Sequence, residues 1–281
     1  ARLTCQQPDE FCFDQFQKYP LAGARERSEK VYAQRFRQLG VSQNGDHDHL
    51  EGRFAPKGTV ADNADLLKEI ARGYLEFRQC PHRSRRGPRL PGREGSLPDC
   101  LTSRGCSCTD AHPRMRLGLV AHFIKKEDHS LALRHSGSEG PDPEFRRGCR
   151  HQQLRQELMI RGRALRSLLQ HSRLARELIT GIDAAANELD APPEAFAPVF
   201  RLMRRARLPH ACYHAGEDFR HLVSGIRAVI EAVEYLDLRD GDRIGHATAL
   251  GIDPALWHAK IGERVVMRRE DALDDALFAY R

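Results

Sequence analysis

Long apolar runs are missing from this sequence of 281 residues, and so are internal repeats of the solenoid kind. No stretch approaches the roughly 20 consecutive apolar residues that a membrane-spanning helix needs. No charged segment followed by an apolar one opens the chain, as it would in a secretory leader. We therefore expect a cytoplasmic protein with no membrane partner. The hydrophobic fraction is 40%, and the length suffices for one large domain with its own core.

Acidic residues are scarce between Pro81 and Arg116, where eight arginines face three acids and supply +5 of the net charge of +6. Residues 81–113 are rich in Pro, Arg, Gly, Ser and Cys and have few apolar residues. This composition predicts a disordered insertion, or else a stretch of corrupted translation. Because the rest of the chain is nearly neutral, we do not expect the folded domain to bind nucleic acid.

The eight cysteines do not form a recognisable framework. Cys100, Cys106 and Cys108 cluster with His112, at spacings that fit no standard zinc ribbon or finger. We expect unpaired thiols there and no metal.

Apolar periodicity predicts alternating strands and helices after residue 116. The apolar stripes predict helices beginning near Ala61 and near Pro192, and a third one that Asp218 would cap. The expected strands are 117–124, 179–183, 211–214 and 242–246, and the longest expected helix is 152–178.

The spacing of polar residues at the strand ends points to a parallel barrel. Asp183 and His214 are 31 residues apart, and His214 and His246 are 32 apart. One strand, one helix and two short loops fill such an interval, which is the βα unit. Since active sites of these barrels lie at the carboxyl ends of the strands, we expect these side chains to meet there.

His214, Glu217 and His246 carry the chemistry that this arrangement allows. A histidine at a strand end can offer a neutral imidazole nitrogen to zinc. A glutamate three residues on would overhang the same pocket, where partial desolvation suits it to proton transfer. A histidine from the next strand could orient a metal-bound hydroxide.

Two segments resemble motifs of the adenosine deaminase family, in the metal-dependent amidohydrolase superfamily. Tyr213-His-Ala-Gly-Glu-Asp218 is similar to the family's fifth-strand motif, and Arg243-Ile-Gly-His-Ala247 to its sixth. The resemblance implies that His214 binds Zn²⁺, that Glu217 protonates purine N1 and that His246 is catalytic. Gly181-Ile-Asp-Ala-Ala-Ala-Asn-Glu188 resembles the fourth strand, so Asp183 and Ala186 are expected to line the purine pocket.

Ala186 and Ala247 depart from the family pattern, which has glycine at both positions. A methyl group at either place could crowd the ligand, because glycine serves where backbone must approach closely. The departure puts nucleoside affinity in doubt rather than the fold.

The remaining zinc ligands are open at the level of sequence. His47-Asp48-His49-Leu50-Glu51-Gly52 fits the family's first-strand pattern, which supplies two zinc ligands. Residues 50–56 also resemble the second-strand motif, and the order of elements favours that interpretation, with His47 and His49 an accidental pair. Asp274-Asp275 is similar to the family's eighth-strand pair, but it stands in a stretch of helical composition, so we expect a helix there.

The fold expected from this resemblance is α/β, of the (β/α)8 TIM-barrel type and incomplete, with about strands 2 to 6 present. Residues 1–281 would form a single partial deaminase domain interrupted by the insertion at 81–113. The segments 53–62 and 187–193 resemble the deaminase subunits of the RADAR phage-defence system. That similarity implies antiviral defence and a homo-oligomer.

The expected activity is zinc-dependent hydrolytic deamination of adenosine or an adenine nucleotide such as ATP, giving the inosine product and ammonia. The alternatives are an AMP deaminase-like amidohydrolase, a catalytically inactive deaminase-like scaffold, and a nucleic-acid binder that uses residues 81–116. The chain alone could be inactive, because only one zinc ligand, His214, follows securely from the motifs.

Overall fold

The computed structural model describes residues 31–40, 49–77, 116–128, 150–261 and 264–281. The expected insertion at 81–113, His47 and the cysteine cluster at 100–108 lie outside these ranges. The strands are β1 (His49–Phe54), β2 (Arg116–Ile124), β3 (Ile179–Ala185), β4 (His210–Ala215) and β5 (Arg243–His246). The helices are α3 (Tyr32–Gly40), α4 (Val60–Phe77), α7 (Gln152–His171), α8 (Arg173–Leu178), α9 (Pro193–Arg205), α10 (Leu222–Leu236), the 3₁₀ helix η5 (Thr248–Gly251), α11 (Pro254–Ile261) and α12 (Arg269–Tyr280).

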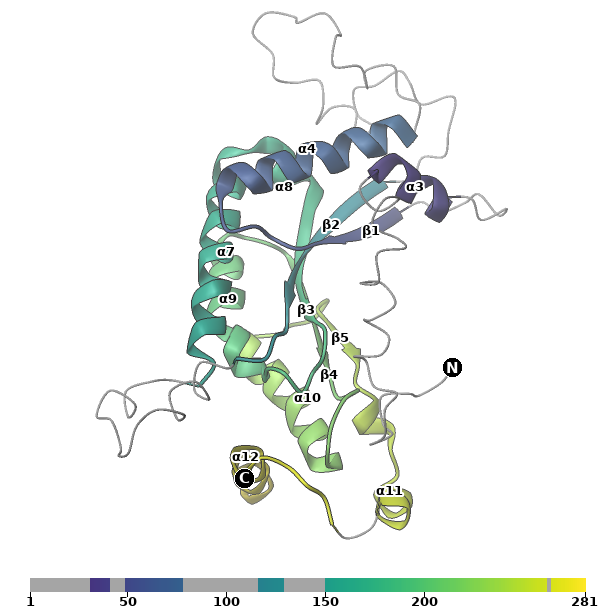
Figure 1. Ribbon diagram of the computed structural model, residues 1–281, viewed down its shortest axis with the longest axis vertical. Helices are drawn as coiled ribbons and strands as arrows, with labels where there is room; N and C mark the ends of the chain where they lie inside the picture. Colours follow the sequence, from purple (N-terminus) through teal and green to yellow (C-terminus); the bar gives the residue numbers. More distant parts are fainter. Residues whose placement is uncertain (1–30, 41–48, 78–115, 129–149, 262–263) are drawn as a thin grey trace, which may run out of the picture. The chain divides into compact units, whose positions relative to one another are not determined.

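The strands form one five-stranded, all-parallel sheet in the order β1-β2-β3-β4-β5, flanked by helices (Figure 1). Neighbours in the sheet are therefore neighbours in sequence, and helices fill the connections after β3 and β4. This is an α/β fold compatible with an incomplete barrel of the TIM type. The four strands expected after residue 116 are confirmed, each within a few residues.

The chain divides into two compact units, and the division falls within β2 and β3. Of the described residues, one unit contains 122–128, 150–162, 182–261 and 264–281, and the other contains 31–40, 49–77, 116–121 and 163–181. In the second unit, α3 packs on α4, where Phe36 meets Tyr74 edge to face at 5.4 Å between ring centroids. The buried Asn63 closes the start of α4, since its amide donates to the carbonyls of Lys57 and Thr59.

The first unit is built around β4, with α9 and α10 packed together and α10 against the strand. The apolar stripe expected for α9 is confirmed, because Phe196, Val199, Phe200 and Met203 are all buried. The ring of Tyr213 on β4 lies between Phe196 and Phe200, at 5.7 and 6.1 Å between centroids. Residues of β4 alternate between two faces of the sheet, so Tyr213 faces α9 while Cys212 and His214 face the other way.

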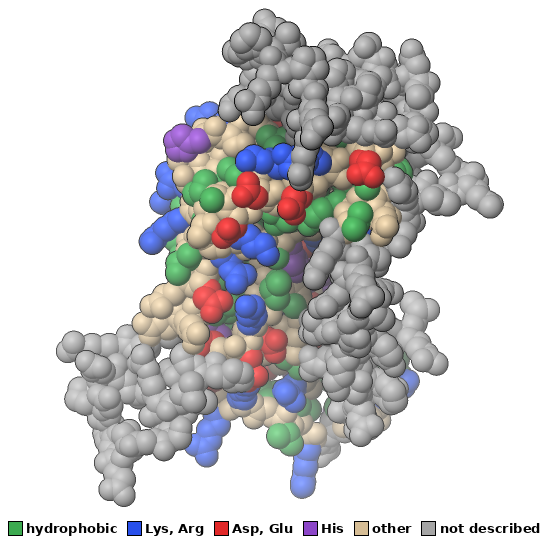
Figure 2. All heavy atoms as spheres, turned by 45° about the horizontal axis from the view of Figure 1, so that its top comes forward, with side chains coloured by type: hydrophobic (Ala, Val, Ile, Leu, Met, Phe, Trp, Pro, Cys, Tyr) green, Lys and Arg blue, Asp and Glu red, His purple; other side chains and the backbone are tan. Residues whose placement is uncertain are grey.

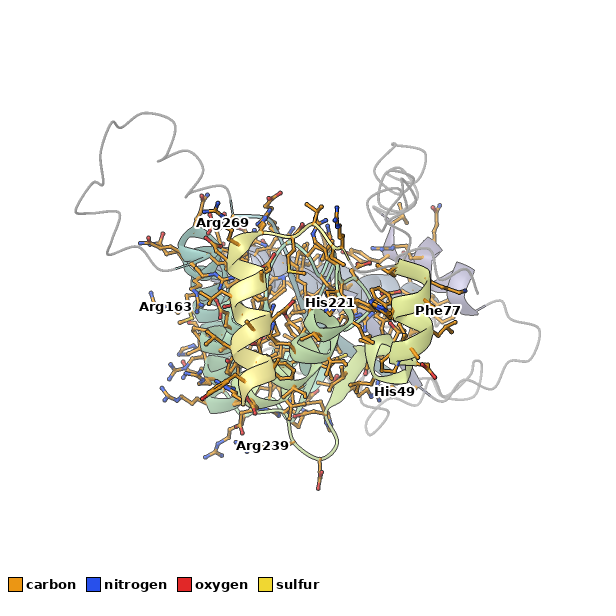
Figure 3. All side chains as sticks on the ribbon, turned by 90° about the horizontal axis from the view of Figure 1, so that it is seen from below. His49, Phe77, Arg163, His221, Arg239 and Arg269 are labelled. Atoms are coloured by element: carbon orange, nitrogen blue, oxygen red, sulfur yellow. The ribbon has the colours of Figure 1, made fainter. Side chains whose placement is uncertain are left out.

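Three details of the helices differ from expectation. The helix expected over 152–178 is broken at Ser172, whose side chain accepts from the N–H of Ala175 and begins α8. The cap of α10 is not Asp218 but His221, labelled in Figure 3, whose Nδ1 accepts from the N–H of Val223. Ile230 and Val233, expected in the buried stripe of α10, are exposed, whereas the small residues Gly225 and Ala232 are buried.

Asp274 and Asp275 lie in α12, as their helical surroundings predicted. None of the described helices is long and apolar enough to cross a membrane. On the face shown in Figure 2, acidic and basic side chains of the described residues are interspersed and form no broad patch of one sign.

Candidate functional site

Side chains from four consecutive strands meet at the carboxyl ends of β2 to β5. His122 comes from β2, Asp183 from β3, His214 from β4 and His246 from β5. In the register of β4 and β5, His214 stands beside Gly245 and Ala215 beside His246. The expectation that Asp183, His214, Glu217 and His246 lie at strand ends therefore agrees with where the structure places them.

Asp183 is the buried centre of this group, with no exposed surface. One carboxylate oxygen, Oδ2, lies 3.2 Å from Nδ1 of His122. The other, Oδ1, lies 3.6 Å from Nε2 of His214. A carboxylate buried this deeply needs such partners, because an isolated charge in a protein interior is very costly.

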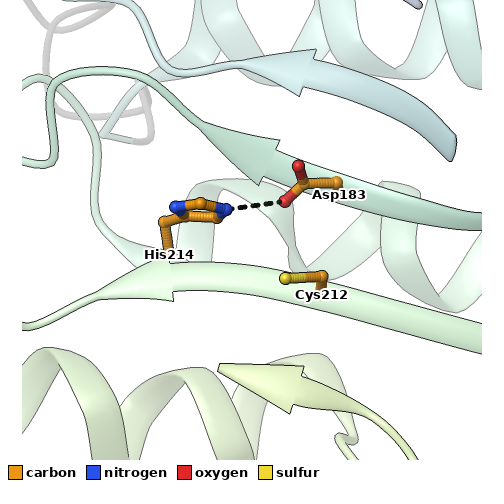
Figure 4. A group of neighbouring side chains, drawn as sticks. All are labelled: Asp183, Cys212 and His214. Atoms are coloured by element: carbon orange, nitrogen blue, oxygen red, sulfur yellow. Dashed lines mark ion pairs between the residues drawn. The ribbon is translucent and has the colours of Figure 1, made fainter. Parts of the chain in front are cut away.

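Cys212 joins Asp183 and His214 on the same side of the sheet (Figure 4). It precedes His214 by two residues on β4, and this spacing puts both side chains on one face of a strand. The sulfur, one carboxylate oxygen of Asp183 and one ring nitrogen of His214 all lie within 4.8 Å of one another. These three residues could hold a metal ion, and among the described residues they are the group with that geometry.

Glu217 and His246 form a second pair beside the first. Oε2 of Glu217 lies 3.0 Å from Nε2 of His246, and the side chains are 25% and 40% exposed. The rings of His246 and His214 meet edge to face, with 5.0 Å between their centroids. A carboxylate and an imidazole in hydrogen-bond reach, open to solvent and next to candidate metal ligands, can exchange protons with a bound molecule.

The turns after β4 and β5 are tied together, and this fixes the pair. Gly216 has a φ of +81°, and His246 and Ala247 also adopt left-handed backbone at +63° and +52°. The N–H of Ala247 donates to the carbonyl of Ala215 at 3.0 Å, and the hydroxyl of Thr248 donates to the carbonyl of Gly216 at 2.6 Å.

Gly245 explains why a glycine precedes the histidine in this motif. A Cβ atom at this position would lie 2.7 Å from Cγ and Nδ1 of the His214 ring. No real Cβ atom tolerates that distance from ring atoms, so a side chain here would displace the imidazole. The bare backbone of β5 thus serves as a flat support for His214.

Lys125 and Glu188 form hydrogen bonds with the backbone of residues 214–218, the segment that carries Glu217. Lys125 is only 3% exposed, and its Nζ donates to the carbonyl of His214 at 2.5 Å and lies 4.2 Å from the centroid of the Tyr213 ring. Burial lowers the pKa of Lys125 to about 8, and the nearby Glu188 carboxylate opposes that change. Oε2 of Glu188 accepts the N–H groups of Glu217 and Asp218 at 3.0 and 3.4 Å.

Burial also raises the pKa of Glu188, and Lys125 is the largest influence in the other direction. The two residues line a cavity of about 90 Å³ together with Tyr213, Arg227 and Glu231. This cavity lies on the helix-covered face of β4, the face of Tyr213 rather than of His214. It is smaller than the roughly 300 Å³ of ordinary ligand pockets, so we place no substrate there.

Ala186 follows β3 directly and has a φ of +104°. L-residues rarely adopt this backbone, whereas glycine adopts it without cost. The position where the resembled family has glycine is therefore one where glycine is favoured on backbone grounds as well. Ala247, the second departure, likewise has left-handed backbone.

His49 is the first residue of β1, so it stands at the amino end of its strand, whereas the site residues stand at carboxyl ends. This placement is the one expected if His49 belongs to the second-strand motif. His47, the other half of the pair, lies outside the described residues.

The sequence alone did not predict a role for four residues of the site: His122, Lys125, Glu188 and Cys212. A signal existed for two of them. His122 is the one polar residue inside an otherwise apolar strand segment, and Cys212 is two positions before His214, on the same strand face. Lys125 and Glu188 act through backbone groups of a distant segment, which no local pattern reveals.

Neither a protein-family model nor a curated protein matches this chain.

Proposed function

We propose that this chain carries the site of a zinc-dependent hydrolase that deaminates adenosine or an adenine nucleotide such as ATP. The observation that carries the proposal is the Glu217–His246 pair, 3.0 Å apart, beside the imidazole of His214. The motif resemblance of the two segments that contain these residues supports the same reaction. The proposal includes a nucleotide as well as a nucleoside as substrate. It also includes a homo-oligomer, as the resemblance to the defence system implies.

His214 would hold the zinc ion, and the donors around it suit that metal. Imidazole nitrogen, thiolate and carboxylate are the ligands that zinc takes in proteins. When bound, zinc would lower the pKa of a water molecule far below its value in bulk water and so supply the nucleophile.

The chain's own residues supply the proton transfers. Hydrolytic deamination adds water at C6 of adenine and releases ammonia, and addition at C6 moves electron density onto N1. Glu217, whose side chain is 25% exposed, would donate a proton at N1. His246 would orient the attacking water, take its proton and pass it to the amino group, which leaves C6 as ammonia. Ala186 would flank the purine at the end of β3.

Glu217→Gln tests the assignment directly. We expect zinc binding to be unchanged and deamination to fall about 10²- to 10⁴-fold, the usual contribution of a positioned acid or base. The measurement is formation of the inosine product and ammonia from adenosine and from ATP. Glu234→Gln on the exposed face of α10 is the matched control, and it should keep full activity.

Retained activity in Glu217→Gln would contradict the assignment of Glu217. A wild-type chain that binds zinc but turns over neither substrate would favour the alternative of an inactive deaminase-like scaffold. The backbone of Ala186 supports that alternative. Its φ of +104° is one that glycine favours, and its methyl group stands beside the expected purine position, where it would crowd the ligand.

A further inference from the structure

We propose that Asp183, Cys212 and His214 together form a three-donor site for zinc, in which the Cys212 sulfur binds as a thiolate. This inference deepens the proposed function and rests on it for the assignment of His214 as a ligand. It adds two donors to which the resemblance gives no metal role, the carboxylate of Asp183 and the sulfur of Cys212.

The distance between the two best-placed donors fits a shared cation. Nε2 of His214 and Oδ1 of Asp183 lie 3.6 Å apart, which is longer than a direct N–H···O hydrogen bond. Two ligands that each lie about 2.1 Å from a tetrahedral zinc ion are separated by about 3.4 Å. The observed separation is therefore close to that of two ligands of one ion.

The sulfur completes the set from the same strand face. Its distance to the other two donors is within 4.8 Å, and a zinc ion bound to all three would lie about 2.3 Å from the sulfur. On binding, the S–H bond of Cys212 breaks, its proton passes to solvent and a sulfur–zinc bond forms. Three protein donors leave the fourth position open, as in catalytic zinc sites.

The surroundings hold two of the donors in place. His122 engages Oδ2 of Asp183 at 3.2 Å and so turns Oδ1 toward His214. Such a histidine–carboxylate contact outside the ligand set orients metal ligands in many proteins. Gly245 supports the face of the His214 ring, and Lys125 holds the His214 carbonyl.

The test uses the full chain with its seven other cysteines replaced by serine, so that the cluster at 100–108 cannot contribute. Co²⁺ is added alone as the probe. We expect the near-ultraviolet charge-transfer band of a thiolate–cobalt bond together with the visible bands of tetrahedral Co²⁺. Cys212→Ser should abolish the charge-transfer band and weaken binding by at least about 100-fold. His122→Ala should keep the band and weaken binding roughly 10- to 100-fold, as loss of an outer contact does.

His210→Ala is the matched control, because His210 is an exposed histidine on the same strand, and its Co²⁺ affinity should equal that of the parent. X-ray absorption of the zinc-loaded parent chain needs no variant and should show one sulfur at about 2.3 Å. A zinc shell without sulfur, or an unchanged charge-transfer band in Cys212→Ser, would overturn the inference.

The outcome is separable from that of the proposed function. Zinc bound through sulfur in a chain that deaminates neither substrate would leave this site standing and defeat the deaminase assignment. Deamination by a chain whose zinc shell contains only nitrogen and oxygen would do the reverse.

Discussion

His151 shows how one residue makes stability depend on pH. It precedes α7 with a left-handed φ of +55°, and its Nδ1 has no hydrogen-bond partner among the described residues. Burial lowers the pKa of His151 below its usual value of 6.5, and the adjacent Arg150 acts in the same direction. The folded chain therefore binds a proton here less readily than the unfolded chain does.

The sign of the effect follows from linkage. Stability is complete above the unfolded pKa of about 6.5 and is lost as the pH falls toward the folded pKa. Asparagine tolerates left-handed backbone and does not titrate in this range. We therefore expect the His151→Asn variant to lose less free energy of unfolding than the wild type when the pH falls from 7.5 to 5.5. Urea unfolding at both pH values measures this. The exposed His258→Asn should follow the wild type, and equal losses in all three chains would refute the prediction.

At the scale of elements, α12 is joined to α10 by a charged contact that is nearly buried. The carboxylate of Asp275 accepts hydrogen bonds from Nε of Arg227 at 2.8 Å and from the hydroxyl of Ser224 at 2.5 Å. Arg227 also donates a hydrogen bond to the carboxylate of Glu231 at 3.1 Å. Because α12 buries almost no apolar side chain, this contact is a main attachment of the helix.

Asp275→Asn should lower the free energy of unfolding by about 2 kcal/mol, since hydrogen bonds to charged groups contribute about 1.5–3 kcal/mol and Arg227 retains Glu231. Glu270→Gln on the same helix removes a carboxylate that is 62% exposed and should cost less than about 0.5 kcal/mol. Denaturant titration of the two variants distinguishes them. Equal effects would mean that α12 is not held through Asp275.

The elements themselves were largely predictable because local patterns specify them. The apolar runs at β2 and β3 and the stripe of α9 can be read from sequence, and the βα spacing placed Asp183, His214 and His246 at one edge of the sheet. The break at Ser172 was missed because a polar residue can cap a helix or sit inside one. The buried face of α10 was partly misplaced because two of its buried residues, Gly225 and Ala232, are small and add little to an apolar pattern.

The site was predictable in part for the same reason. Residues within a motif were found, but the pairing of Asp183 with His122 depends on two strands whose separation in sequence is 61 residues. The burial of Lys125 runs against the ordinary preference of lysine for solvent. Only the fold brings a carbonyl and an aromatic ring to its amine, so composition could not reveal it.

At the scale of the whole molecule, every proposed metal donor belongs to the unit containing residues 122–128, 150–162, 182–261 and 264–281. A ligand stabilises the folded state that it binds, by about 2.7 kcal/mol when its free concentration is 100 times its Kd. Zinc should therefore slow amide hydrogen exchange in β4 and α10, and leave α4 of the other unit at its apo rate. A chelator should reverse the effect, and His214→Ala should abolish it. Equal protection of both units would contradict the prediction.

The contribution of one side chain from each of four strands also has a consequence for biosynthesis. Asp183 and Cys212 are separated by 29 residues, and His122 and His246 by 124. No short peptide of this chain contains Asp183 together with Cys212 and His214, and contacts between residues distant in sequence form slowly in folding. A chain emerging from the ribosome thus lacks the complete three-donor site until β4 has left the exit tunnel, so the proposed cation site can form only after residues 183 to 214 have been synthesised.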